Sequence, residues 1–154
     1  MFHFISRIAL FDAISLSLFF QAARAKVEEL WDHLMVSADE RALFKDFTSP
    51  ELSDELLQSH EQHISLLTAR ANAMRPVLEL IARRDELKRT TLVLAEMETD
   101  PDRYKKPRHL IEEERLRKQL RAMPKLEAEL RAQIPAWEAQ YGEFRVVRPL
   151  HLNK

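Results

Sequence analysis

The sequence predicts an all-α protein with a single domain, and three of its features support this class. The 154 residues include one glycine, Gly142, so the chain lacks the residue on which tight hairpins, bulges and phosphate loops depend. Leu, Ala, Glu, Arg and Lys dominate the composition, as is typical of long helices with charged surfaces. Apolar residues also recur at heptad spacing. We therefore expect an elongated, antiparallel bundle of three helices.

The first 25 residues are strongly apolar and need a separate interpretation. Only Arg7 and Asp12 are charged before Phe20, and Ala23-Arg24-Ala25 resembles a small-x-small cleavage site, so a secretory signal is one possibility. Against it, Asp12 divides the apolar stretch, which is also shorter than the ~20 residues that span a bilayer. We expect residues 1–25 to form a helical segment, either the end of a preceding rod or a start foreign to the domain. We expect no membrane partner.

Residues 26–49 are predicted to contain the end of an amphipathic helix and a short second helix. Apolar residues in the first helix follow i, i+3, i+4, i+7 spacing: Val27, Leu30, Trp31 and Leu34. Ser37 followed by Glu40 has the spacing of a capping box, so a short helix through Phe44 should follow. Residues 46–49 break the pattern and are predicted to form a turn.

A long helix is predicted from Ser49-Pro50 to about Thr99, because serine can cap a helix and proline is tolerated at the first helical position. It would measure roughly 70 Å at 1.5 Å per residue, with Pro76 as its expected kink. Two heptad series run through it: Leu57, Ile64, Ala71 and Leu78, and His60, Leu67, Met74 and Ile81.

Asp100-Pro101 should end this helix, and residues 102–109 read as an exposed basic loop because they lack apolar periodicity. The next predicted helix returns antiparallel from about Leu110 to Tyr141. Its apolar heptad positions include Leu116, Met123, Leu130 and Trp137.

Two prolines and the single glycine shape the end of this returning helix. Pro124 and Pro135 should bend it, and Gly142 is placed to stop it. Because each apolar stripe needs a partner, residues 26–144 are predicted to form a three-helix, spectrin-like domain. Residues 145–154 should form an irregular tail.

The sequence offers no constellation for catalysis, a metal or a cofactor, and we expect none of the three. It has no cysteine, which excludes disulfides, thiolate zinc sites and cysteine nucleophiles. His60 and His63 have i, i+3 spacing rather than the i, i+4 spacing of zinc helices, which favours a partly buried helix histidine. The three glutamates of residues 112–114 point around a helix and are better explained as acids in a first helical turn.

Basic side chains form the candidate binding site. The formal net charge is −1, so attraction to a charged partner must come from local clusters. Three groups should meet at one tip: Arg83, Arg84, Lys88 and Arg89; Arg103, Lys105, Lys106 and Arg108; and Arg115, Arg117, Lys118 and Arg121. Neighbouring acids dilute them, so an ordinary solvated face is the alternative interpretation. Trp31 and Trp137 occupy apolar positions, so the aromatic platform for nucleic acid is missing and we expect no nucleic-acid partner.

Several motifs occur in a fixed order along the chain. They are Glu29-Leu30-Trp31-Asp32-His33-Leu34, Asp39-Glu40-Arg41, Thr99-Asp100-Pro101-Asp102-Arg103, the run from Leu110 to Lys118, the run from Met123 to Leu130, and Trp137-Glu138. They resemble the E-L-W-x-x-L, E-E-R, S-D-P-x-R, L-L-x-E-E-K-x-R-K, L-P-x-L-E-x-x-L and W-E motifs of one family. This is the anaphase-spindle-elongation and protein-regulator-of-cytokinesis family of antiparallel microtubule-bundling proteins. The resemblance covers roughly residues 25–144.

The resemblance implies a spectrin-like domain that docks on microtubules, with basic residues against the acidic tubulin surface. It implies a module of a non-motor crosslinker of the spindle midzone and cytokinesis, located in the cytoplasm on the cytoskeleton and spindle. Arg103 matches the arginine of D-P-x-R, Arg108 the loop arginine, and Arg115 the basic residue after E-E. The candidate contact residues are Arg83, Arg84, Lys88, Arg103, Lys105, Lys106, Arg108, Arg115 and Lys118.

The chain also departs from the family pattern. Its loop lacks the family's glycines, and Glu112 stands where relatives carry lysine or arginine, so we expect weaker affinity, with Lys105 and Lys106 as compensation. Full-length relatives dimerise through an N-terminal rod that is missing here, so we expect microtubule binding without crosslinking. The alternative function is a structural helical rod that pairs with a partner helix through the series from Leu57 to Ile81, without binding microtubules.

Overall fold

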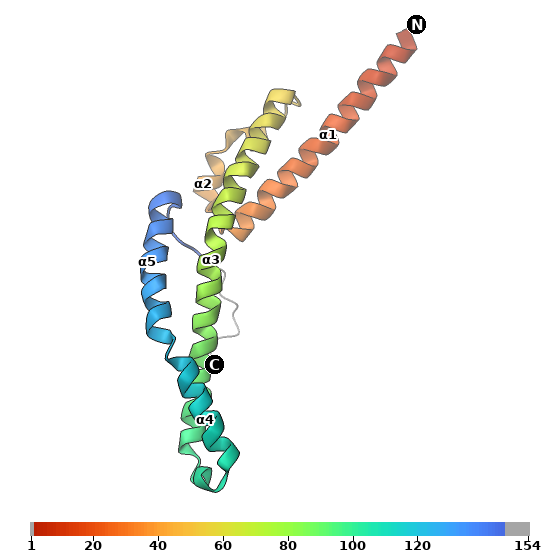
Figure 1. The fold of residues 1–154 in the computed structure, drawn as a ribbon. Helices are drawn as coiled ribbons and strands as arrows, with labels where there is room; N and C mark the ends of the chain where they lie inside the picture. The colour runs from red at the N-terminus through yellow and green to blue at the C-terminus, as the bar shows by residue number, and fades with distance from the viewer. Residues whose placement is uncertain (1, 147–154) are drawn as a thin grey trace. The chain divides into compact units, whose positions relative to one another are not determined.

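The computed structural model describes residues 2–146, with side chains from Asp12 onward, and every regular element in this part of the chain is helical. The predicted all-α class is therefore confirmed. The elements are α1 (Phe2–His33), α2 (Ala38–Ala42), the 3-10 helix η1 (Lys45–Thr48), α3 (Asp54–Thr99), the 3-10 helix η2 (Arg103–Lys105), α4 (Pro107–Leu120) and α5 (Met123–Tyr141). Figure 1 labels the five α-helices. No helix in the described part is long and apolar enough to cross a membrane.

The chain divides into two compact units, and α3 runs through both. The first unit contains the residues up to Asn72, and the second is formed by Ala73–Phe144. A single three-helix bundle of the spectrin type stays a prediction. The predicted tail lies outside the described residues from position 147 onward.

In the first unit, α1 packs against the start of α3. The predicted helix end at Lys26 is the continuation of one helix that begins at Phe2. Its buried residues recur at helical spacing and include two from the apolar N-terminal segment: Phe20, Ala23, Val27, Leu30, Trp31 and Leu34. The stripe therefore crosses position 25 without interruption, and a domain boundary there stays a prediction.

Two histidines of α3 lie inside an aromatic cluster of the first unit. His60 is fully buried, and its Nδ1 donates to the carbonyl oxygen of Leu56 at 2.8 Å. His63 stacks on Phe44 with ring centroids 4.0 Å apart, and its Nε2 accepts a hydrogen bond from Trp31 Nε1 at 3.2 Å. The pair thus has packing and hydrogen-bonding roles within the core. No group of three or more metal-binding side chains is found in the described part of the chain.

We expect the free energy of unfolding to fall as the pH drops below about 6.5, the ordinary pKa of histidine. Burial, and then the charge of His60, lower the pKa of His63 in the folded chain, while Glu40 partly opposes them. The unfolded chain therefore binds this proton first, and stability present above the ordinary pKa is lost on acidification. Protonation also removes the acceptor that Trp31 uses.

Urea titrations at pH 7.5 and 5.5 test this expectation when wild type is compared with His63→Gln, which keeps a polar acceptor and does not titrate. The pH dependence of the variant should be smaller. The indole N–H resonance of Trp31 should shift in wild type over the same pH range. An equal pH dependence in both proteins would show that His63 contributes nothing to it.

The segment between α1 and α3 corrects two predicted boundaries. Ser37 Oγ accepts from the backbone N–H of Glu40 at 3.2 Å, which confirms the cap, but α2 ends at Ala42 and η1 occupies the predicted turn. The predicted start of α3 at Ser49 is wrong. Residues 49–53 are not helical, and the carbonyl oxygen of Ser49 accepts a hydrogen bond from Arg24 Nη2 at 2.7 Å. Ser53 caps the helix instead, because its Oγ accepts from the N–H of Leu56 at 3.2 Å.

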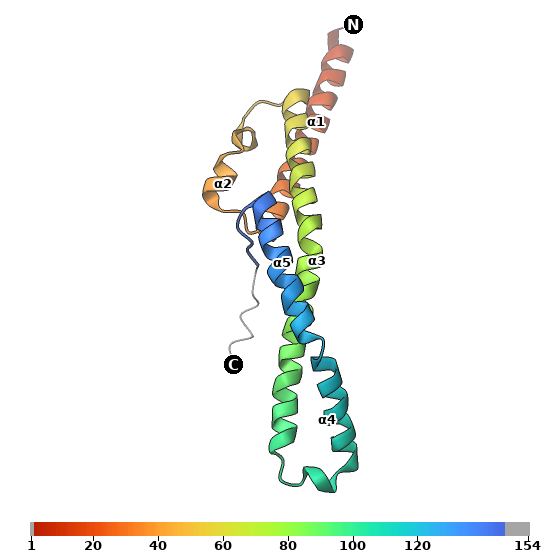
Figure 2. The same cartoon turned by 60° about the vertical axis from the view of Figure 1, so that its left-hand side comes forward.

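In the second unit, α4 and α5 run beside the C-terminal part of α3, as Figures 1 and 2 show. The predicted helix from Leu110 to Tyr141 starts earlier, at Pro107, and is interrupted between Leu120 and Met123. The second helix begins there with Pro124 in its first turn, where a missing N–H costs nothing. Buried apolar residues line the inner faces: Met74, Val77, Leu87 and Leu94 of α3, Leu116 of α4, and Leu126, Leu130 and Trp137 of α5.

Gly142 ends α5 as predicted. Its φ of 92° lies in the region that favours glycine, and its N–H donates to the carbonyl oxygen of Glu138 at 2.9 Å. Pro76 and Pro135 both lie inside their helices.

Candidate functional site

The loop between α3 and α4 is short and internally paired. Asp100 Oδ1 accepts from the N–H of Asp102 at 2.9 Å, which turns the chain after α3. Lys106 Nζ lies 2.8 Å from Asp100 Oδ2, and Lys105 Nζ lies 2.7 Å from Asp102 Oδ1. The hydrogen bond from Lys106 lowers the pKa of Asp100, and the same bond raises the pKa of Lys106. Both loop lysines therefore have an acidic partner within their own loop.

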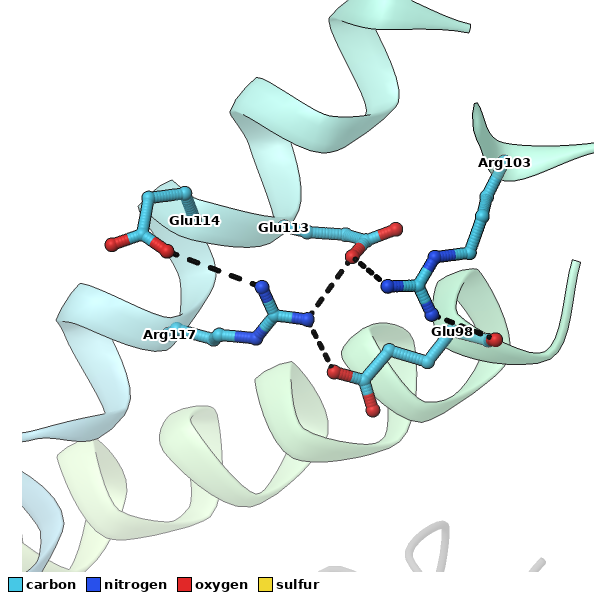
Figure 3. A network of polar contacts seen from close by, with 5 residues as sticks. All are labelled: Glu98, Arg103, Glu113, Glu114 and Arg117. Atoms are coloured by element: carbon cyan, nitrogen blue, oxygen red, sulfur yellow. Dashed lines mark hydrogen bonds and ion pairs between the residues drawn. The ribbon is translucent and has the colours of Figure 1, made fainter. Parts of the chain in front are cut away.

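Beneath the loop lies a buried carboxylate, that of Glu113. This side chain of α4 is 1% exposed and receives two arginines. Arg103 of η2 places Nη2 3.3 Å from Glu113 Oε2, and Arg117 places Nη2 3.1 Å from the same oxygen. Figure 3 shows the carboxylate between the two guanidinium groups. The charge of Glu113 is thus compensated although water does not reach it.

The same two arginines tie α4 and η2 to the end of α3. Arg103 Nη1 donates to the carbonyl oxygen of Glu98 at 3.1 Å, and Arg117 Nη2 lies 2.7 Å from Glu98 Oε1. The bond to Glu98 raises the pKa of Arg117. We call Glu98, Arg103, Glu113 and Arg117 the tip network. It joins the end of α3, the loop, and the middle and last turn of α4, so it fixes the shape of this turn (Figure 3).

The tip network corrects the interpretation of the three consecutive glutamates. They do not lie in a first helical turn, because α4 begins at Pro107. Glu113 faces the core, and Glu112 pairs with Arg115, which lowers the pKa of Glu112. One signal in the sequence could have identified Glu113: it precedes Leu116 by three residues and therefore lies on the same helix face.

The predicted site residues fall into paired and unpaired sets. Those with an acidic partner are Arg84 with Asp85, Arg103 with Glu113, Lys105 with Asp102, Lys106 with Asp100, and Arg115 with Glu112. Those exposed and without an ion pair in the described residues are Arg83, Lys88, Arg108 and Lys118. Local acids therefore neutralise much of the expected positive tip. The cations that remain free lie on α3 and α4 rather than in the loop.

The structure does not bring all three basic groups together. Arg84 lines a shallow groove with residues of α5, among them Leu130 and Ile134, and Arg83 shares another with Gln133. At 1.5 Å per residue, these arginines lie about 24 Å along α3 from its end at Thr99. The loop and the start of α4 meet at that end, whereas Arg83 and Arg84 belong to the α3–α5 part of the unit.

Comparison with known proteins gives a consistent set of relatives. The model of the family described as Microtubule associated protein (MAP65/ASE1 family) matches residues 14–147. The chain is 30% identical over 129 residues to protein regulator of cytokinesis 1 of Homo sapiens, covering 82% of this chain and 21% of the relative. It is 31% identical over 133 residues to anaphase spindle elongation protein 1 of Schizosaccharomyces pombe, covering 82% and 18%.

A third relative, protein regulator of cytokinesis 1 of Mus musculus, is 27% identical over 126 residues, covering 80% of this chain and 21% of the relative. The chain therefore spans about a fifth of the length of the curated relatives it matches.

Proposed function

Because this chain belongs to the MAP65/ASE1 family of microtubule-associated proteins, we propose that it is the microtubule-binding module of a non-motor crosslinker. Its relatives are named for anaphase spindle elongation and for the regulation of cytokinesis, so the proposed setting is the spindle midzone, on the cytoskeleton. The role is one of binding and positioning, and it requires no catalysis.

The observation that carries this proposal is the pair of unpaired cations on α4. Arg108 and Lys118 are exposed and have no acidic partner among the described residues, so their charge is available to an acidic surface. The other predicted contact residues at the tip form ion pairs with acidic side chains of the chain itself. We therefore assign direct contact with tubulin to Arg108 and Lys118 first.

Arg103 takes a different role in this proposal. Its side chain is 19% exposed, and it is bonded to Glu113 and to the carbonyl of Glu98. These bonds make it a positioning residue, which holds the loop and α4 in the orientation that presents the free cations. Its match to the family arginine is then explained by the architecture of the turn.

Co-sedimentation of the chain with microtubules at two salt concentrations tests the proposal. Charges separated by more than about 8 Å are screened at physiological ionic strength, so binding should be clear at low salt and fall as salt rises. A chain that stays in the supernatant at low salt would refute the module function. If the fraction that pellets with microtubules is the same at both salt concentrations, the contact is made through apolar surface alone.

The structure gives the alternative function, a helical rod for a partner helix, little support. That function needs the heptad series of α3 to be free for a partner. Three positions of the two predicted series, His60, Leu67 and Met74, are already buried within the chain, and the other five are half-buried: Leu57, Ile64, Ala71, Leu78 and Ile81.

A further inference from the structure

We propose that Ile111 is an apolar anchor at the centre of the surface through which α4 contacts the microtubule. This inference rests on the proposed function and adds to it a contact that charge alone does not identify. Ile111 lies in the second turn of α4, and the residue is 71% exposed. The surface concerned, here called the outer α4 face, comprises Arg108, Ile111, Arg115 and Lys118.

The helix places these four residues side by side. At 3.6 residues per turn, positions 108, 111, 115 and 118 lie within roughly 80° of one another around the axis. Glu113 and Leu116, which are buried, lie on the opposite side of α4. The outer face is therefore turned away from the core, and the tip network fixes the helix in this orientation.

A single exposed isoleucine on a soluble domain is ordinary and needs no explanation by itself. The setting of Ile111 is what distinguishes it. Unpaired cations stand on the same face about one turn before it, at Arg108, and about two turns after it, at Lys118, and the nearer Arg115 is paired with Glu112. Protein interfaces commonly combine an apolar centre, which loses its water on binding, with a polar rim.

Charge complementarity commits this face to one occupant, the acidic tubulin surface of the proposed function. The free cations would steer the approach and set the register. Ile111 would then supply a contact that salt does not screen, because the hydrophobic effect depends on buried area rather than on charge. The contribution of the cations to affinity should therefore depend on salt, whereas the contribution of Ile111 should not.

The test compares Ile111→Asn with a matched control, Leu92→Asn. Leu92 lies on α3 in the same unit and is 67% exposed, so both variants exchange one exposed apolar side chain for an amide. Affinity for microtubules is measured by co-sedimentation at several salt concentrations. Ile111→Asn should weaken binding about tenfold at every salt concentration, an amount consistent with burial of part of one aliphatic side chain. Leu92→Asn should bind as wild type does.

The slope of log affinity against log salt should be the same for Ile111→Asn and for wild type. Wild-type affinity of the Ile111 variant would overturn the inference, and so would a changed salt slope or an equal loss in the Leu92 variant. Both residues are exposed, and circular dichroism should show unchanged melting for both. If wild type itself fails to pellet, the proposed function falls. If wild type pellets and Ile111→Asn pellets equally well, the inference about Ile111 is refuted and the proposed function stands.

Discussion

Replacing Glu113 by alanine should destabilise the second unit by about 3 kcal/mol, because it leaves a mostly buried arginine without its counter-charge. Arg103 is 19% exposed and would lose its carboxylate partner inside the turn. The side chain of Arg117 is 41% exposed, so water would still solvate its charge after the carboxylate is removed. The expected cost therefore lies at the low end of the range for broken buried ion pairs. Urea unfolding followed by circular dichroism measures the change.

Two controls isolate the buried charge from its neighbours. Glu114→Ala removes an adjacent carboxylate that is half exposed. Its distance from Arg117 Nη1 is 4.0 Å, which is long for an ion pair, so the variant should cost less than about 0.5 kcal/mol. The double variant Arg103→Ala with Glu113→Ala should cost clearly less than the sum of the single variants, because the two side chains act as one unit. Additive losses, or a Glu113→Ala cost equal to that of Glu114→Ala, would contradict the tip network.

The heptad pattern of the sequence predicted much of the helical core. His60, Leu67, Met74, Leu116, Leu130 and Trp137 were all assigned to apolar series and all are buried. Gly142 was identified as a stop because glycine alone tolerates a positive φ at little cost. Such features depend on local periodicity and on backbone sterics, which a sequence carries directly.

The helix boundaries were harder because two serines offered competing caps. Ser49-Pro50 and Ser53 both precede acidic residues, and either could have opened α3. In the structure residues 50–53 are not helical and Ser53 provides the cap, while the carbonyl oxygen of Ser49 accepts a hydrogen bond from Arg24 of α1. No local pattern contains that information.

The sequence proposes the basic residues of the candidate site, which stay a prediction, but it does not reveal their ion pairs. Lys105 and Lys106 read as free loop cations, yet they reach Asp102 and Asp100 once the loop turns. Glu113 was interpreted as one of three acids in a first helical turn, yet it lies further along α4 and is buried. Which cations remain available depends on distances of a few ångströms between side chains, and only the folded loop sets them.

Reversing the two free charges of α4, in Arg108→Glu with Lys118→Glu, should weaken microtubule binding at least about tenfold, or about 1.4 kcal/mol. The change places two carboxylates where the proposal puts cations against an acidic lattice, so attraction becomes repulsion. Neither side chain forms an ion pair with a described residue, so the fold should keep its stability. Co-sedimentation at physiological ionic strength, about 0.15 M, measures the loss, and circular dichroism checks the fold.

The matched control is Arg83→Glu with Lys88→Glu, which alters the net charge by the same amount on α3. These side chains are also exposed and have no ion pair among the described residues. At 1.5 Å per residue they lie about 24 and 17 Å from the end of α3, well beyond a Debye length of about 8 Å. The control should therefore lose less than about twofold in affinity. Equal losses in both variants would mean that the contact surface extends along α3, as the sequence suggested, because screened long-range charge could not produce them.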